Sequence, residues 1–132
     1  MKIVVDTSAV IAVITNEKHK ENLITITKGA DLIAPSSLHW EIGNAFSAMF
    51  KRGRISLKQA KRALDSYGEI PLRFTDIELS TALEIAENLN IYAYDAYVIG
   101  CASKHKAPLV SLDQGLIEAA AKVGVKAREV SL

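Results

Sequence analysis

Short, uninterrupted apolar runs alternate with helix-length segments along this chain, and this alternation limits the folds that the chain can adopt. Strands that are buried on both faces lack a polar–apolar alternation, and they belong to parallel sheets covered by helices on both sides. The pattern therefore predicts an α/β fold, a three-layer sandwich with a mostly parallel sheet of about five strands. The expected strands are 2–5, 31–35, 70–74, 108–112 and 126–130.

Local signals mark the ends of several helices between these strands. Ser56 and Gln59 have the spacing of a capping box, and Thr75 and Glu78 have the same spacing before the next predicted helix. Segment 94–105 is apolar almost all round, so we expect a buried helix there. The expected helices are 7–15, 17–28, 37–52, 56–67, 76–90, 94–105 and 113–123.

The size and composition of the chain fit one globular domain over residues 1–132. Of the 132 residues, 49% are hydrophobic and 23% are charged, which is enough apolar material for a real core. The net charge of +1 excludes a generally polycationic surface. The single cysteine, Cys101, cannot form an internal disulfide, and its apolar surroundings predict an inert core residue in a reducing compartment. No apolar run is long enough to span a bilayer and no signal peptide is recognisable, so we expect a cytoplasmic protein without a membrane contact.

Four carboxylates have positions that point toward one edge of the predicted sheet. Asp6 ends the first strand, Asp113 ends the fourth, and Asp95 opens the buried helix that leads into the fourth strand. Ligands of open α/β sheets bind outside the carboxyl ends of the strands. Glu41 flanks the apolar stripe of its helix, where a charge is costly unless it is compensated.

Each of these acids also has an ordinary structural explanation. Asp6 and Asp95 are suitable helix N-caps, Asp113 suits a turn or cap, and Glu41 is able to extend its charge into water. Taken together, however, clustered carboxylates repel one another unless a cation lies between them, and no Lys or Arg stands within three residues of the three aspartates. Hard oxygen ligands with room for water favour Mg²⁺ or Mn²⁺, which serve the hydrolysis of phosphodiesters.

The segments around these acids resemble the four acidic motifs of a known family. VVDTSAVIAVI, SSLHWEIGNAF, YDAYVIGCA and LVSLDQGL, in this order, are similar to the motifs of the PIN-domain nucleases, and most similar to those of the VapC toxins of toxin–antitoxin pairs. The resemblance covers nearly the whole chain. It implies a PIN-like fold and an endoribonuclease that depends on Mg²⁺ or Mn²⁺ and is usually a homodimer. It also implies a small antitoxin protein that holds the enzyme inactive and is able to form a higher assembly with it.

Carried over by position, the resemblance makes four acids the catalytic and metal-binding residues: Asp6, Glu41, Asp95 and Asp113. Ser8 matches the hydroxyl that the family places two residues after the first acid. Ser111 stands where the family more often has threonine, two residues before the fourth acid, and it keeps the hydroxyl. We expect these two serines to contact the acids or the substrate.

Other functions were weighed against this interpretation. A receiver domain needs a second acid adjacent to Asp6 and a late lysine, and a haloacid-dehalogenase-type phosphatase needs an aspartate where Ser8 stands. Neither pattern is present. A PIN-domain RNA-processing nuclease without an antitoxin remains an alternative, as does a catalytically silent RNA-binding PIN scaffold.

Segment 51–62 contains six basic residues and no acid. It is either the solvated face of two helices or a surface that follows RNA phosphates, and for the second case we predict contacts from Arg52, Arg54 and Lys58.

Trp40 either packs in the core or stacks on a base, and its size favours packing. We further expect an antitoxin to insert an arginine among the four acids, with its helix anchored on Trp40, Phe46 and Phe50.

Overall fold

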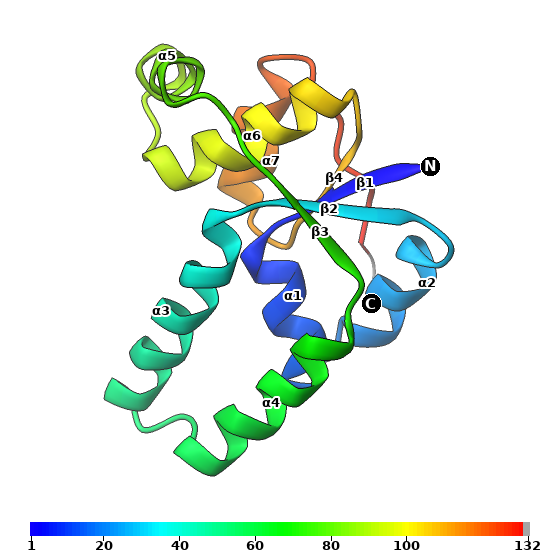
Figure 1. Ribbon diagram of the computed structural model, residues 1–132, viewed down its shortest axis with the longest axis vertical. Coiled ribbons are helices and arrows are strands. Elements are labelled where there is room, and N and C mark those ends of the chain that lie inside the picture. Colours follow the sequence, from blue (N-terminus) through cyan, green and yellow to red (C-terminus); the bar gives the residue numbers. More distant parts are fainter. Residues whose placement is uncertain (131–132) are drawn as a thin grey trace.

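The computed structural model describes residues 1–130, and in this part of the chain helices and strands alternate as the sequence predicts (Figure 1). The strands are β1 (Lys2–Val5), β2 (Asp31–Pro35), β3 (Leu72–Thr75) and β4 (Leu109–Val110). The helices are α1 (Thr7–Ile14), α2 (Lys20–Thr27), α3 (Ser37–Lys51), α4 (Leu57–Glu69), α5 (Leu79–Leu89), α6 (Ala93–His105) and α7 (Gln114–Ala121).

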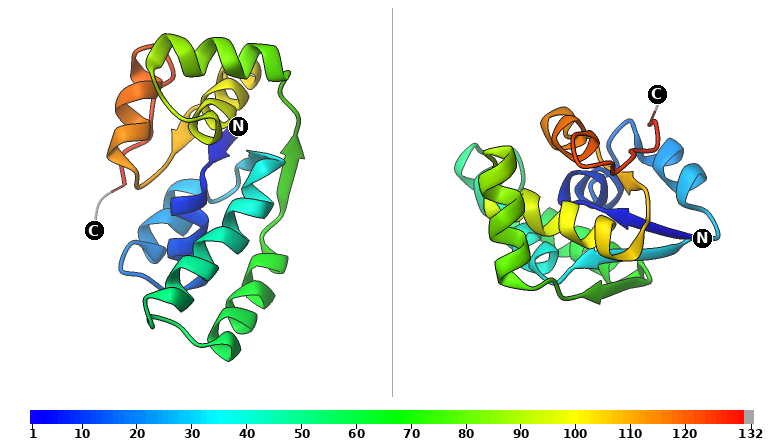
Figure 2. Two further views of the ribbon diagram at one scale, coloured as in Figure 1. Left: turned by 90° about the vertical axis from the view of Figure 1, so that its left-hand side faces the viewer. Right: turned by 90° about the horizontal axis from the view of Figure 1, so that it is seen from above.

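The strands form one parallel sheet in the order β3-β2-β1-β4. Successive side chains of a strand point to opposite faces, and β1 shows this directly. Ile3 and Val5 pack into one core with α1, α2, α3 and α4, whereas Val4 packs into a second core with α6 and α7. Helices therefore cover both faces of the sheet, with α1–α4 on one side and α5–α7 on the other (Figures 1 and 2). The predicted three-layer α/β architecture is confirmed.

The last expected strand, 126–130, contributes only a single parallel bridge between Ala127 and Leu109. Two backbone hydrogen bonds accompany this bridge, from Leu109 N to Lys126 O at 2.9 Å and from Arg128 N to Leu109 O at 2.8 Å. The reason is the length of β4, which spans two residues before the chain turns at Ser111. The described part of the sheet thus has four strands.

One of the two predicted capping boxes forms. The Gln59 N–H donates to Ser56 Oγ at 3.1 Å, and the Ser56 N–H donates to Gln59 Oε1 at 2.9 Å. The second prediction is wrong, because α5 begins at Leu79 with Glu78 as its N-cap and without a side-chain cap bond. Thr75 is instead the last residue of β3, where it pairs with Pro35 of β2.

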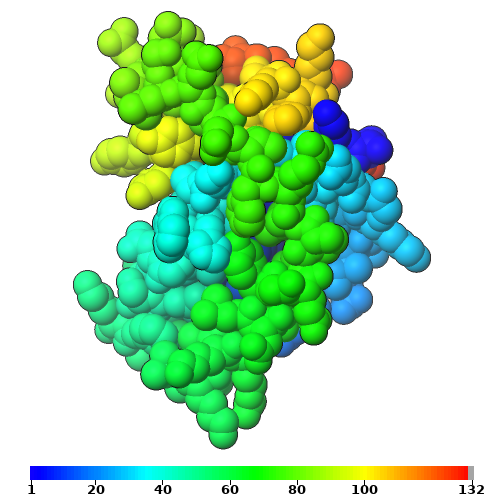
Figure 3. All heavy atoms as spheres, in the orientation of Figure 1, coloured from blue at the N-terminus to red at the C-terminus, as the bar shows by residue number. Residues whose placement is uncertain are grey.

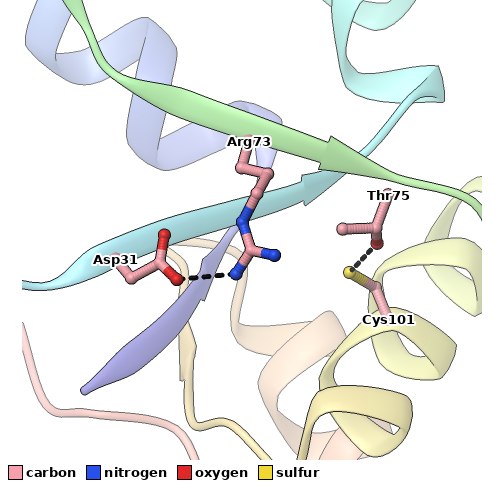
Figure 4. Close-up of polar contacts among 4 residues, drawn as sticks. All are labelled: Asp31, Arg73, Thr75 and Cys101. Atoms are coloured by element: carbon pink, nitrogen blue, oxygen red, sulfur yellow. Dashed lines mark hydrogen bonds and ion pairs between the residues drawn. The ribbon is translucent and has the colours of Figure 1, made fainter.

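Two polar contacts hold the edge strand β3 (Figure 4). Arg73 forms an ion pair with Asp31 of β2 at 2.6 Å, on the exposed side. Thr75 Oγ1 lies 3.3 Å from Cys101 Sγ of α6. Cys101 is buried, as predicted, and burial raises the pKa of its thiol, which keeps it unreactive. In the described residues, no helix has the length and apolar character needed to cross a membrane.

Candidate active site

Asp6 lies at the carboxyl end of the central strand β1 and is the N-cap of α1. Its Oδ1 accepts a hydrogen bond from the Ala9 N–H at 3.0 Å, so the capping explanation is correct. The side chain is only 5% exposed, and two serine hydroxyls also contact it. Burial raises the pKa of Asp6, and the nearby negative charge of Asp113 adds to this, although the hydrogen bonds oppose it. Asp6 is therefore both the N-cap of α1 and a member of a group of acids.

Ser8 and Ser111 connect Asp6 to the end of β4. Ser111 Oγ donates to Asp6 Oδ2 at 2.6 Å, and Ser8 Oγ lies 2.8 Å from Oδ1 and 2.9 Å from Oδ2. Each serine oxygen also accepts a backbone N–H at 2.9 Å, from Leu112 for Ser8 and from Asp113 for Ser111. The two hydroxyls thus contact the first acid, as predicted, and they fix its orientation.

Glu41 projects from the second turn of α3 beside the buried stripe of that helix, which Leu38, Ile42 and Phe46 form. It is partly buried, and burial together with the negative charges of Asp6 and Asp95 raises its pKa to about 7. Its interpretation as a freely solvated surface acid is therefore wrong. Glu41 changes its protonation state close to neutral pH, which is unusual for a carboxyl group.

Two hydroxyl residues beside Glu41 were not singled out by the sequence analysis. Ser37 Oγ donates to Glu41 Oε2 at 3.4 Å, one turn earlier on α3. The Thr7 hydroxyl lies close enough to lower the pKa of Glu41, yet its oxygen is buried and makes no hydrogen bond of good geometry. The signal for Ser37 was its position four residues before Glu41, on the same side of the helix.

Asp95 and Asp113 complete the set of acids. Asp95 lies in the first turn of α6, whose N-cap is Tyr92, so its interpretation as an N-cap is wrong. Burial and the charge of Asp113 raise the pKa of Asp95. Asp113 is exposed and caps α7, accepting a hydrogen bond from the Leu116 N–H at 3.2 Å. The structure therefore confirms Asp113 as a cap and also places its charge near two of the other acids.

Electrostatic interactions connect all four carboxylates. Asp113 acts on Asp6 and Asp95, and both Asp6 and Asp95 act on Glu41. They come from the starts of α1, α3, α6 and α7, which converge at one edge of the sheet (Figure 1). Within residues 1–130, none of the four takes part in an ion pair. This edge therefore concentrates negative charge that no basic side chain compensates by direct contact.

The donor atoms of this edge suit a hard divalent cation. Asp6 is contacted by three protons, from Ser8, Ser111 and Ala9, whereas an ionised carboxylate has about four acceptor positions, so one remains for a cation. In the described residues, no three acidic, His or Cys side chains lie close enough together to form a ready-made site. Mg²⁺ does not require one, because it keeps several waters and is commonly bound through one or two carboxylates.

The predicted RNA-binding residues lie at the far end of α3. Arg52 follows α3, Arg54 lies in the turn to α4, and Lys58 lies in the first turn of α4; all three are exposed. Lys51 is ten residues after Glu41, which places this basic segment roughly 15 Å from the acids along the helix. The structure does not bring the basic segment into contact with the acids, and its role stays a prediction.

The aromatic predictions need correction. Trp40 is 73% exposed, so the packing interpretation is wrong. The signal was available in the sequence, because Trp40 lies two residues from both Leu38 and Ile42 and so faces away from the buried stripe. Phe46 is buried at 4% exposure and does not line a surface groove, whereas Phe50 is partly exposed.

Comparisons with known proteins agree with this fold. The family model of the PIN domain matches residues 3–122, and the chain belongs to the PIN-domain family. The structure is similar to that of PAE2754 from Pyrobaculum aerophilum, with a TM-score of 0.71 and 22% identity over 90% of this chain and 79% of the other. Among curated protein sequences, none matches the chain significantly.

Two further structures are similar to this one. One is VapBC2 from Rickettsia felis bound to a DNA fragment from their promoter, with a TM-score of 0.72 and 16% identity over 99% of this chain and 100% of the other. The second is FitAcB from Neisseria gonorrhoeae, with a TM-score of 0.68 and 14% identity over 96% of each chain. At these identities the likeness concerns the fold.

Proposed function

We propose that this protein is a metal-dependent endoribonuclease, the toxin of a toxin–antitoxin pair, which cleaves RNA phosphodiester bonds by attack of water. The observation that carries the proposal is the set of four carboxylates from four different helix starts, of which Asp6, Glu41 and Asp95 have pKa values raised by burial and by neighbouring acids. Within residues 1–130 none of the four has a basic partner. Membership of the PIN-domain family supports it. A silent RNA-binding scaffold gains nothing from mutually repelling acids, since they also repel RNA phosphates.

Asp6, Glu41, Asp95 and Asp113 would hold the Mg²⁺ or Mn²⁺ ion in this proposal. When bound, the ion lowers the pKa of a water molecule and neutralises charge on the phosphate oxygens. Ser8 and Ser111 donate hydrogen bonds to Asp6, which favour its ionised form against the effect of burial and fix its orientation. Because its pKa is about 7, Glu41 releases a proton near neutral pH, so cation binding is coupled to proton release.

The protein's own residues also position the substrate and the proton. In the metal-free protein the Glu41 carboxyl exchanges its proton near pH 7, and a bound cation would hold it in the ionised form as a ligand. The exposed side chains of Arg52, Arg54 and Lys58 contact phosphates of the RNA chain some nucleotides away from the scissile bond. Binding and chemistry are thus carried by opposite ends of α3.

The partners in this proposal are RNA, a small antitoxin protein and a second copy of the chain. The similar structures named after VapBC2 and FitAcB are those of paired proteins, which supports an antitoxin for this chain as well. An antitoxin arginine suits the acidic edge because its guanidinium binds a carboxylate at two points.

Exposed apolar side chains on α4 and α5 offer surface for a homodimer or a higher assembly with the antitoxin. They are Leu57, Leu64, Leu79 and Leu83. The site of action is the cytoplasm.

Incubation of the purified protein with single-stranded RNA tests the nuclease activity. We expect internal cleavage with Mg²⁺ or Mn²⁺, none in chelator, and none from an Asp6→Asn variant purified in parallel. RNA that is bound but never cut would favour the silent scaffold. Cleavage without growth arrest on induction in a bacterial host, and without a small antitoxin gene beside the gene for this protein, would favour an RNA-processing enzyme.

A further inference from the structure

Trp40 is the single tryptophan of the chain, and its exposure is not explained by the core or by the acid cluster. It lies on α3 directly before Glu41. Tryptophan is enriched at contacts with other molecules, because its ring offers a large apolar area and its N–H a polar end. The surroundings of Trp40 indicate which kind of molecule this is.

Trp40 begins a straight stripe along the solvent face of α3. Asn44, Ser47 and Lys51 follow it at spacings of four, seven and eleven residues, and all are exposed. The stripe runs roughly 16 Å along the helix and ends at the basic segment 51–62. Glu41 lies beside its beginning, about 100° around the helix. Figure 3 shows α3 at the molecular surface, with only small areas of α1 (blue) visible between α3 and α4.

The Trp40 ring has a defined support. His39 meets it in a T-shaped contact with ring centroids 4.8 Å apart and an interplanar angle of 81°. His39 is itself held by Tyr67 of α4, with Nδ1 and Oη 3.2 Å apart, and its ring lies 6.3 Å from that of Phe74. The indole therefore rests on His39, which Tyr67 and Phe74 hold in place, while most of the indole surface stays open.

The neighbours of Trp40 on this stripe favour a nucleic acid over a protein. A protein interface surrounds its central aromatic residues with further apolar ones and few charges. Here the remaining stripe members are polar or cationic, and the exposed leucines lie on α4 and α5 instead. An aromatic ring followed by a cationic surface is the combination that binds single-stranded nucleic acid, since the ring stacks on a base and the cations follow the phosphates.

We propose that Trp40 stacks on an unpaired base of the RNA and thereby places the neighbouring phosphodiester at the acidic edge. This inference rests on the proposed nuclease function and extends it: the substrate is single-stranded at the cleavage site, and the strand runs along α3 toward Lys51 and Arg52. Trp40 is a substrate-binding residue, and the chemistry stays with the four acids.

The fluorescence of the single tryptophan tests this directly. A short single-stranded oligoribonucleotide of mixed sequence is added in chelator, so that it is bound but not cut. We expect a saturable fall in emission whose midpoint equals that of binding measured by the anisotropy of a labelled copy of the same RNA. Inorganic polyphosphate, which carries the charge without bases, should leave the emission unchanged.

Variants separate stacking from a structural role. Trp40→Ala should weaken RNA binding by about 5- to 150-fold and raise KM more than it lowers kcat, while Trp40→Phe should recover most of the affinity. Ile24→Ala, which removes exposed apolar surface from α2, is the control and should bind as the wild type does. Circular dichroism checks that each variant is folded.

The possible failures can be told apart. RNA that is bound and cleaved without any change in tryptophan emission overturns the stacking and leaves the nuclease function standing. No binding and no cleavage by the wild type overturns both. If Trp40→Ala instead converts a dimer to a monomer in sedimentation and leaves KM unchanged, Trp40 belongs to an interface between copies and the inference is wrong.

Discussion

The two ends of α3 differ in burial, in charge and in what determines their behaviour. Near its start, Glu41 is partly buried, and burial together with the negative charges of Asp6 and Asp95 raises its pKa to about 7. At its end, Lys51 and Arg52 extend into water. Tertiary packing therefore sets the protonation behaviour of the acidic end. The exposed cations of the basic end act only through the partner that they contact. Each prediction below tests one side of this contrast.

The largest effect is expected from Asp6→Asn at the acidic end. The substitution removes one of four interacting charges from the central strand end, so RNA cleavage should fall by roughly 10²- to 10⁴-fold or become undetectable. Rates on a defined oligonucleotide with Mn²⁺ measure this. Cleavage at the wild-type rate, free of contaminating nuclease, would remove Asp6 from the site.

The same variant keeps its fold in our expectation, because asparagine retains an acceptor for the Ala9 N–H. In chelator its melting temperature should equal or exceed that of the wild type, since one repelling charge is gone. Adding Mg²⁺ or Mn²⁺ should raise the melting temperature of the wild type more than that of the variant. A variant that melts clearly lower in chelator, with both proteins indifferent to metal, would make Asp6 a structural cap only.

Ser111→Ala is expected to have the next largest effect. It removes the 2.6 Å hydrogen bond to Asp6 Oδ2 and leaves the Asp113 N–H without its acceptor. Loss of a group that orients a metal ligand typically costs about 10- to 100-fold in metal affinity or activity. Titration of Mn²⁺ against cleavage rate measures the loss. Ser103→Ala, at an exposed position of α6 away from the acids and from the solvent face of α3, is the matched control and should be silent.

The basic end should respond more weakly and in a different way. Replacing Arg52 and Arg54 together with alanine should weaken RNA binding without regard to sequence. The slope of log K against log salt should become less steep by about 1.4, since each phosphate contact on a single strand contributes about 0.7. The control replaces Lys122 and Lys126 with alanine, since both are exposed and follow the C-terminal end of α7, the opposite end of that helix from Asp113. An unchanged slope in the arginine variant would leave 51–62 as a solvated face.

The smallest effect concerns stability against pH in the metal-free protein. The pKa of Glu41 is raised from 4.5 to about 7 in the folded state, so between these values the folded state binds more protons than the unfolded state. Stability should therefore be highest below about pH 4.5 with respect to this group and fall as the pH rises toward 7. Melting temperatures across this range should fall less in Glu41→Gln. Equal slopes in the two proteins would mean that Glu41 is not under strain.

Much of the fold could be predicted because strands that are buried on both faces of a sheet consist of short, uninterrupted apolar runs. The apolar runs around Val4 and Leu109 predict buried strands, and the alternation with helices predicts the layers. Asp6 and Asp113 could be predicted as caps and as strand-end acids, since both properties follow from position along the chain. The capping box at Thr75 and Glu78 failed because the pairing of Thr75 with Pro35 extends β3 through that residue.

The sequence by itself determined the order of the elements, the two faces of the sheet and the edge where the acids lie, because these follow from hydrophobic periodicity and chain direction. Only the tertiary structure decided how the acids affect one another. The pKa of Glu41 depends on Asp6 and Asp95, which are far away in the chain and close in space. The same is true of the support for Trp40, since Tyr67 holds His39 from another helix. Interactions through space between distant segments leave no periodic signal in the sequence, so packing alone set them.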